Sequence, residues 1–223
     1  MSKEQTTTLY IIRHGESKGN ALGNSRFGAE EGSTDWGLTE TGKEQATKIG
    51  KKLEHIPFNL ILSSTMLRAR QTAEIIASDN NLKIKTMDNI HERSLREYLK
   101  NHPDLTQEDL KRQMLNDLVE LDDKGKMSYK YSTDMESAQE AASRLGTALQ
   151  EIGRDHPSEH LLVVTHGNLM RSFLTDIGFA KYNELPSDSI DNTGYAVLQN
   201  DAGSFTVQET YGIHTNPNGR RAF

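Results

Sequence analysis

The chain of 223 residues contains no cysteine, and this absence excludes disulfide bonds and thiolate chemistry. It also fits a reducing compartment. No apolar run approaches the length of a membrane-spanning helix, and the polar residues 1–8 lead into no apolar segment long enough for a signal peptide. The formal net charge of −6 argues against a general affinity for nucleic acid. We therefore expect a cytoplasmic protein with no nucleic-acid and no membrane partner.

Internal repeats and low-complexity segments are also lacking, and the length fits one domain with an insertion. Short apolar runs alternate with segments of helical periodicity, which predicts a three-layer α/β/α sandwich with a mostly parallel central sheet over residues 1–223. Residues 94–134 are more polar. They show a helical pattern at 106–121 and a predicted break at 122–126, so we expect a helical insertion here. The pattern leaves open whether it forms a lid or a merely structural helix pair.

Two apolar runs each end in a histidine followed by a glycine. Segment 9–15 reads Leu-Tyr-Ile-Ile-Arg-His-Gly, and segment 161–167 reads Leu-Leu-Val-Val-Thr-His-Gly. Such runs predict buried strands, and ligands bind at the carboxyl ends of strands in open α/β sheets. Taken alone, His14 or His166 could be a hydrogen-bonded structural residue. Together they predict one site with two imidazoles.

A third block, Ser-Thr-Met-Leu-Arg-Ala-Arg-Gln-Thr-Ala, occupies residues 64–73. With Arg-His-Gly-Glu at 13–16 and Thr-His-Gly-Asn at 165–168, it resembles the histidine phosphatase superfamily, and the phosphoglycerate mutase-like branch in particular. Arg-His-Gly alone is a weak signal, whereas three blocks in the same order are highly specific. The resemblance extends over nearly the whole chain.

The residue types themselves suit phosphoryl transfer, which requires positioning of the phosphate and neutralisation of its charge. Arg13 and Arg68 carry planar guanidinium groups that match phosphate oxygens. His166 would add a donor once a phosphate holds it protonated. His14 can attack phosphorus only as a neutral imidazole whose other nitrogen donates to a backbone carbonyl or a similar acceptor.

The resemblance implies specific roles for these residues. It implies that His14 is the nucleophile and forms a phosphohistidine, and that Arg13, Arg68 and His166 bind the phosphate. Asn20, in Gly-Glu-Ser-x-x-Asn, matches the phosphate-contacting asparagine of the family.

Glu92 occupies the position of the family's acidic general acid/base, which would protonate the leaving oxygen. Beside a phosphate, like-charge repulsion should raise the pKa of such a carboxyl. The alternative for Glu92 is a solvated carboxylate at a strand end. Ser17 and Asn168 also fall in the motifs, and they either hydrogen-bond the site or cap turns.

No metal or cofactor is inferred. The remaining histidines follow no metal-ligand spacing, and His91-Glu92 lacks the second helical histidine of a zinc-protease motif. The implied partner is a small phosphorylated substrate, and a homodimer is left open as the oligomeric state.

The sequence favours a phosphomonoesterase that acts through a phosphohistidine intermediate on a small phosphorylated metabolite. Gly19-Asn20 stands where cofactor-dependent phosphoglycerate mutases usually carry Trp-Asn, and segment 94–134 is more acidic than their basic insertion. A phosphoglycerate mutase is the alternative. A second alternative is a catalytically weak binding or regulatory member, against which the presence of His14 and Glu92 argues.

Overall fold

A computed structural model describes residues 6–21, 36–78, 82–93, 101–102, 104–201 and 203–216, with only the backbone for 107, 108 and 111. The strands are β1 (Thr7–Arg13), β2 (Leu60–Ser64), β3 (Ile84–Met87), β4 (His160–Thr165), β5 (Ile190–Asp201) and β6 (Ser204–Ile213). The helices are α1 (Lys18–Ala21), α2 (Glu40–Leu53), α3 (Leu67–Ala77), α5 (Gln107–Leu118), α6 (Asp123–Ser128), α7 (Ala138–Asp155) and α8 (Gly167–Asp176), with 3-10 turns η1 (Asp88–Ile90) and η2 (Tyr182–Glu184).

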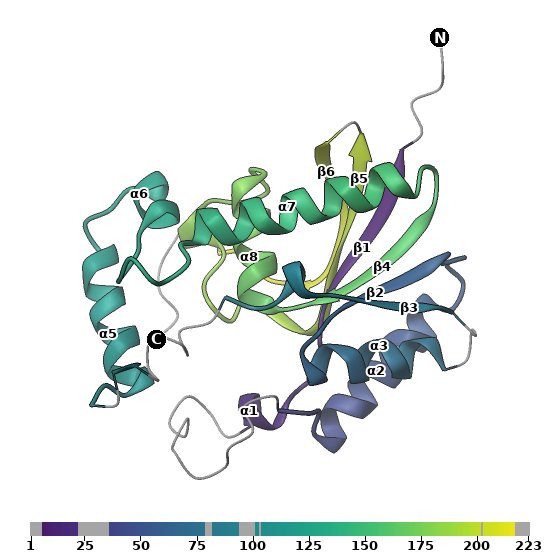
Figure 1. The fold of residues 1–223 in the computed structure, drawn as a ribbon, viewed down its shortest axis with the longest axis horizontal. Helices are drawn as coiled ribbons and strands as arrows, with labels where there is room; N and C mark the ends of the chain where they lie inside the picture. The colour runs from purple at the N-terminus through teal and green to yellow at the C-terminus, as the bar shows by residue number, and fades with distance from the viewer. Residues whose placement is uncertain are drawn as a thin grey trace.

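The six strands form one sheet in the order β3-β2-β4-β1-β5-β6 (Figure 1). The strands β3, β2, β4 and β1 run parallel, and β5 and β6 add an antiparallel hairpin. The predicted mostly parallel sheet is therefore confirmed. Because β1 and β4 are parallel neighbours, with Arg13 opposite Thr165, the residues that follow the two strands emerge side by side.

Helices cover both faces of the sheet, which confirms the three-layer arrangement (Figure 1). In β1, Leu9 and Ile11 pack in the core shared with α7 and α8, whereas Tyr10 and Ile12 pack in the core shared with α2 and α3. A strand buried on both faces reads as a continuous apolar run, as segment 9–12 does. Full burial of one such side chain contributes about 1.5–3 kcal/mol, so the strand that ends at His14 is firmly held.

Side-chain caps fix the starts of the helices that flank the site. The Thr39 hydroxyl accepts a hydrogen bond from the Gly42 N–H at 3.0 Å and so fixes the start of α2. A capping box begins α7: the Ser137 hydroxyl accepts from the Glu140 N–H at 3.1 Å, and the Glu140 carboxylate accepts from the Ser137 N–H at 2.8 Å. Such a cap stabilises a helix by about 1 kcal/mol.

Segment 94–134 contributes two helices, seen at the left of Figure 1. The helix α5 lies within the predicted range 106–121, and the break that follows it lies at 119–122 rather than at the predicted 122–126, because α6 begins at Asp123. The Asp122 carboxylate accepts from the Gly125 N–H at 2.7 Å and caps this helix. One buried residue, Met127, packs with Ala138 of α7. A short polar helix that buries a single side chain shows no apolar periodicity, which is why the sequence pattern missed it.

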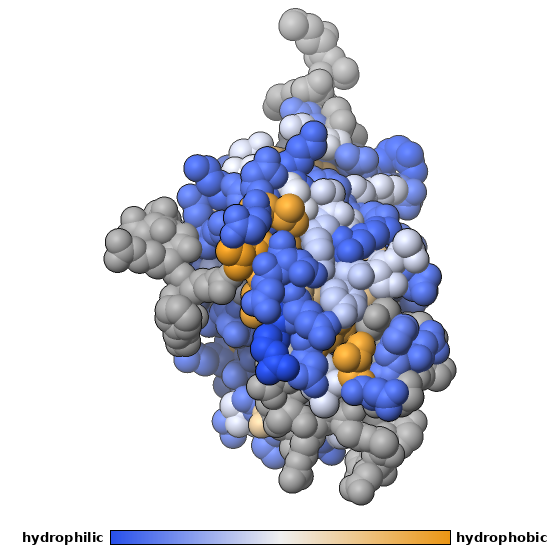
Figure 2. All heavy atoms as spheres, turned by 90° about the vertical axis from the view of Figure 1, so that its left-hand side faces the viewer, coloured by the Kyte–Doolittle hydropathy of each residue, from blue (hydrophilic) through white to orange (hydrophobic). Residues whose placement is uncertain are grey.

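The surface on the α5–α6 side is mostly hydrophilic, with separate small hydrophobic areas (Figure 2). On α5, Leu110 is buried, whereas Leu115 and, just after the helix, Val119 are each 51% exposed and lie one turn apart. Across the described ranges, no helix combines the length and apolar character needed to cross a membrane.

Candidate active site

The two histidines that follow β1 and β4 meet at one edge of the sheet. The ring centroids of His14 and His166 lie 5.2 Å apart with the planes at 64°. Both side chains are buried. The His14 N–H donates to the Thr165 carbonyl at 3.0 Å, so the pairing of the strands extends into the site.

The ring of His14 is held in one tautomer. Its Nδ1 lies 2.7 Å from the Gly15 carbonyl oxygen, which can only accept, so Nδ1 carries the hydrogen and Nε2 keeps its lone pair. The Arg68 Nε donates to this Nε2 at 2.9 Å. Burial, followed by the charge of Arg68, holds the pKa of His14 well below its ordinary value. His14 is thus a neutral imidazole with its nucleophilic nitrogen facing a guanidinium.

A tight backbone contact supports the turn after His14. The Gly15 N–H donates to the Thr72 hydroxyl at 3.1 Å, and that hydroxyl donates to the Arg68 carbonyl at 2.8 Å. A Cβ atom at Gly15 would lie 2.4 Å from the Gly42 carbonyl oxygen, so α2 can approach the turn only because residue 15 has no side chain. Thr72, which sequence reasoning did not single out, links the helix that carries Arg68 to the His14 turn.

One guanidinium nitrogen of Arg13 is hydrogen-bonded, and another has no partner in the described ranges. A terminal nitrogen donates to the Ile190 carbonyl. Its Nε is buried and finds no hydrogen-bond partner in the described ranges. The side chain lies against Gly167, where an added Cβ would come within 3.2 Å of the Arg13 Cδ and Nε.

His166 has a partner on only one ring nitrogen. Its Nε2 lies 2.9 Å from the Ser64 hydroxyl. That hydroxyl also accepts from the Met66 N–H at 3.3 Å, and in the described ranges its own hydrogen has no acceptor other than the His166 Nε2, so the hydroxyl donates to the ring and the ring proton falls on Nδ1. Nδ1 is buried without a partner among the residues that the structure describes.

The expectation that a phosphate holds His166 protonated stays a prediction. Burial, then the charge of Arg68 and the neighbouring His14, hold the pKa of His166 well below its ordinary value. The neutral ring, with hydrogen on Nδ1, is the donor that this geometry provides. Ser64 determines that tautomer.

Glu92 lies at the start of α8 and caps it from outside the helix. One carboxylate oxygen accepts from the Leu169 N–H and the Arg93 N–H, both at 2.9 Å, and the other accepts from the Asn168 N–H at 3.1 Å. These bonds hold the Glu92 carboxylate against the start of α8, and its role as proton donor stays a prediction. Burial raises the pKa of Glu92, although the backbone hydrogen bonds and the charge of Arg68 lower it. The rise matches the expected direction, but its cause here is burial rather than a like charge.

The structure brings five predicted residues together, and the other three make capping or backbone contacts. His14, Arg13, Arg68, His166 and Glu92 interact through the contacts above and through their charges. Ser17 donates from its N–H and hydroxyl to the Asn20 side-chain oxygen at 3.1 and 2.9 Å, which caps α1, and Asn20 is exposed. Asn168 is also exposed and gives the site its backbone N–H.

The described part of the chain contains no group of three or more His, Asp or Glu side chains placed to hold a metal ion. The expectation of metal-independent activity stays a prediction. A neutral imidazole with an unprotonated nitrogen, two guanidinium groups, a second imidazole donor and a carboxyl of raised pKa together make a site suited to phosphoryl transfer.

Residues 9–211 match the histidine phosphatase superfamily (branch 1), and the chain belongs to this superfamily. Membership confirms the resemblance read from the three motifs. It also confirms the expected class of enzyme, a phosphohydrolase of the histidine phosphatase type.

Three similar proteins illustrate the range of the family. An uncharacterized phosphatase, PhoE, of Bacillus subtilis (strain 168) is 27% identical over 179 residues, 77% of each chain. A probable phosphoglycerate mutase, GpmB, of Escherichia coli (strain K12 / DH10B) is 32% identical over 163 residues, 71% of this chain and 69% of the relative. The solved structure of Bacillus stearothermophilus YhfR superposes with a TM-score of 0.72 at 27% identity, covering 90% of this chain and 95% of YhfR.

Proposed function

We propose that the protein is a phosphomonoesterase that transfers the phosphoryl group of a small phosphorylated metabolite to His14 and then to water. One observation carries this proposal: the Nδ1 of His14 is engaged by the Gly15 carbonyl, while Nε2, at a lowered pKa, faces the Arg68 guanidinium. A phosphate that binds Arg68 would replace the hydrogen bond from the Arg68 Nε and so release the Nε2 lone pair for attack on phosphorus.

In the first step, Nε2 of His14 forms a bond to phosphorus as the bond from phosphorus to the ester oxygen breaks. The leaving oxygen takes the proton of Glu92. In the second step, water attacks the phosphohistidine and gives its proton to the Glu92 carboxylate, so that inorganic phosphate leaves and His14 is restored. Arg13, Arg68 and His166 stabilise the negative charge in both steps.

Two buried polar atoms support the phosphate-binding part of the proposal. In the described residues, neither the Arg13 Nε nor the His166 Nδ1 has a partner, and a buried polar group left unpaired is costly. Phosphate oxygens would satisfy both. Asn20 enters the proposal only through its amide nitrogen, because its oxygen is held by Ser17.

A phosphoglycerate mutase is the second candidate, and the name of the 32% identical relative favours it. The two activities differ in the phosphoryl acceptor, water or a second phosphorylated hydroxyl. We propose a single domain of this family in which residues 94–134 form an insertion that contributes to this choice. The contact of Arg93 with the Glu136 carbonyl at 3.0 Å supports it, because these residues flank the insertion and Arg93 is the neighbour of Glu92.

The test is a panel of phosphomonoesters assayed for phosphate release with a chelator present. It is run beside a mutase assay with 3-phosphoglycerate and 2,3-bisphosphoglycerate, and His14→Ala is the control for both. We expect chelator-resistant phosphate release that is absent from His14→Ala. Conversion of 3-phosphoglycerate without phosphate release would identify the mutase instead, and a strict requirement for a divalent cation would contradict the metal-free mechanism.

A further inference from the structure

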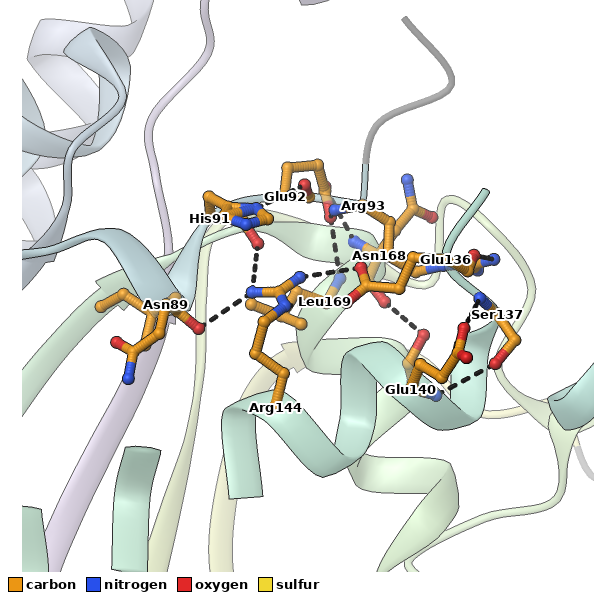
Figure 3. A network of polar contacts seen from close by, with 12 residues as sticks. Asn89, His91, Glu92, Arg93, Glu136, Ser137, Glu140, Arg144, Asn168 and Leu169 are labelled. Carbon is orange, nitrogen blue, oxygen red and sulfur yellow. Dashed lines mark hydrogen bonds and ion pairs between the residues drawn. The ribbon is translucent and has the colours of Figure 1, made fainter. Parts of the chain in front are cut away.

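The segment that carries Glu92 is held by side chains from elsewhere in the fold. Three successive carbonyls precede Glu92, and each accepts a side-chain hydrogen bond. The Arg144 Nη1 donates to the Asn89 carbonyl at 2.9 Å and to the His91 carbonyl at 3.1 Å (Figure 3). The Thr165 hydroxyl donates to the Ile90 carbonyl at 2.8 Å. A connection between a strand and an insertion would ordinarily be free to shift, whereas this one is fixed at three adjacent points.

The guanidinium of Arg144 is itself oriented by a carboxylate. Its Nε and Nη2 bind the two carboxylate oxygens of Glu136 at 2.8 and 2.9 Å, a two-point contact that leaves Nη1 directed at the carbonyls (Figure 3). Arg144 lies in the second turn of α7, and Glu136 lies just before Ser137, which caps this helix. The pair is mostly buried, with side-chain exposures of 18% and 25%.

Glu92 completes the chain of contacts by bonding to the start of α8. Its carboxyl is therefore placed between two helices: Arg144 of α7 holds the backbone before it, and the first N–H groups of α8 hold its oxygens (Figure 3). An acid that delivers a proton to a leaving oxygen must lie within hydrogen-bond reach of it, and a misplacement of about 1 Å can reduce the rate by about 100-fold.

We propose that Arg144 is a positioning residue for Glu92, acting through the backbone of residues 89–91. This inference rests on the proton-donor role of Glu92 in the proposed function. It predicts that loss of Arg144 weakens only those steps that depend on the Glu92 proton. A phosphate ester of a poorly acidic alcohol needs that proton on its leaving oxygen. A nitrophenyl ester does not need it, because its leaving group, nitrophenolate, is a weak base.

The test compares kcat/KM for glycerol 2-phosphate and 4-nitrophenyl phosphate in wild type, Arg144→Met, Arg144→Lys and Glu92→Gln. Arg144→Met should lower kcat/KM for the glycerol ester by about 10- to 100-fold and for the nitrophenyl ester by at most about threefold. Arg144→Lys keeps a cation beside Glu136 but lacks the planar fork, so we expect the same selectivity with a smaller loss. Arg154→Met, an exposed arginine on the same helix, should match wild type.

The double variant Arg144→Met/Glu92→Gln separates positioning from general damage. If Arg144 acts through Glu92, the double variant retains the same ratio of the two kcat/KM values as Glu92→Gln alone. Thermal melting of every variant is measured in parallel, and Arg144→Lys decides the question if Arg144→Met does not fold.

Two outcomes would contradict the account, and they are distinguishable. Equal losses on both esters in Glu92→Gln would refute the proton-donor role of Glu92, and the positioning role with it. Two results would refute only the positioning role. In one, Glu92→Gln loses activity selectively on the glycerol ester and the Arg144 variants do not. In the other, the double variant shows a larger selective loss than Glu92→Gln alone.

Discussion

The Arg68 Nε lies 2.9 Å from the Nε2 of His14 and donates to it, on the side of the ring opposite the Gly15 carbonyl. One cation therefore serves two purposes. It disfavours protonation of the nucleophile, because a positive imidazolium would face a positive guanidinium. It also provides a positive group at the place where phosphorus must approach.

Removal of the Arg68 charge should raise the pKa of His14. In Arg68→Met the coulombic effect on His14 is lost while burial persists, so the pKa rises without returning to its ordinary value. Titration of isotope-labelled histidine by NMR measures this directly. Arg70→Met, which removes a cation from the same helix that is not among the causes of the shift, is the control. An unchanged His14 pKa in Arg68→Met, or an equal rise in both variants, would contradict this electrostatic role.

The pH dependence of kcat/KM should differ between esters. Burial raises the pKa of Glu92 above its ordinary value of about 4.5, so the protonated donor persists to higher pH and is lost as the pH rises through the raised pKa. For glycerol 2-phosphate, kcat/KM should therefore decline along the alkaline limb of the pH profile. For 4-nitrophenyl phosphate the decline along this limb should be small, and in Glu92→Gln it should disappear for both esters. A steep, equal alkaline decline for the two esters that persists in Glu92→Gln would assign the limb to another group.

Gly42 and Gly50 of α2 should respond oppositely to replacement by alanine. At Gly42 a Cβ would lie 2.0 Å from the Glu16 carbonyl oxygen, and such overpacking costs about 1–3 kcal/mol. At Gly50 the nearest atom would be 3.5 Å away, so alanine should stabilise the helix by about 0.5–1 kcal/mol. Denaturant unfolding measures both free energies. Because Glu16 follows the His14 turn, Gly42→Ala should also lower kcat/KM. If the unfolding free energy changed equally in the two variants, the prediction would be wrong, and the turn at residues 14–16 would tolerate a side chain at position 42.

Sequence alone could predict the meeting of His14 and His166, because it requires only that two apolar runs form parallel neighbouring strands. It could also predict α2 and α7, whose caps and apolar spacing are local. The contacts of Glu92 with α8 could not be predicted, because the residues in contact are separated by 76 or 77 positions along the chain. One signal was available: α8 follows His166 and has no capping side chain of its own, so its first N–H groups needed an acceptor from elsewhere.

Arg144 illustrates the other limit. On the sequence it is one charged residue in an amphipathic helix, and its ordinary interpretation is a solvated face. Only the fold shows that its helix position places it against residues 89–91 and beside Glu136. Likewise, the role of Thr72 depends on the distance between α3 and the turn at Gly15, which no local pattern encodes.

The central claim is that the Nε2 of His14 carries the phosphoryl group, and trapping of the intermediate tests it most directly. The enzyme is mixed with 4-nitrophenyl phosphate, quenched in alkali within milliseconds and digested, and the phosphorylated peptide is identified by mass spectrometry, with ³¹P NMR to assign the ring nitrogen. We expect acid-labile phosphate on His14, on Nε2 because Gly15 engages Nδ1, and none in His14→Ala. Phosphate on Nδ1, on His166 or on a hydroxyl, or a normal phosphoenzyme burst in His14→Ala, would contradict the account.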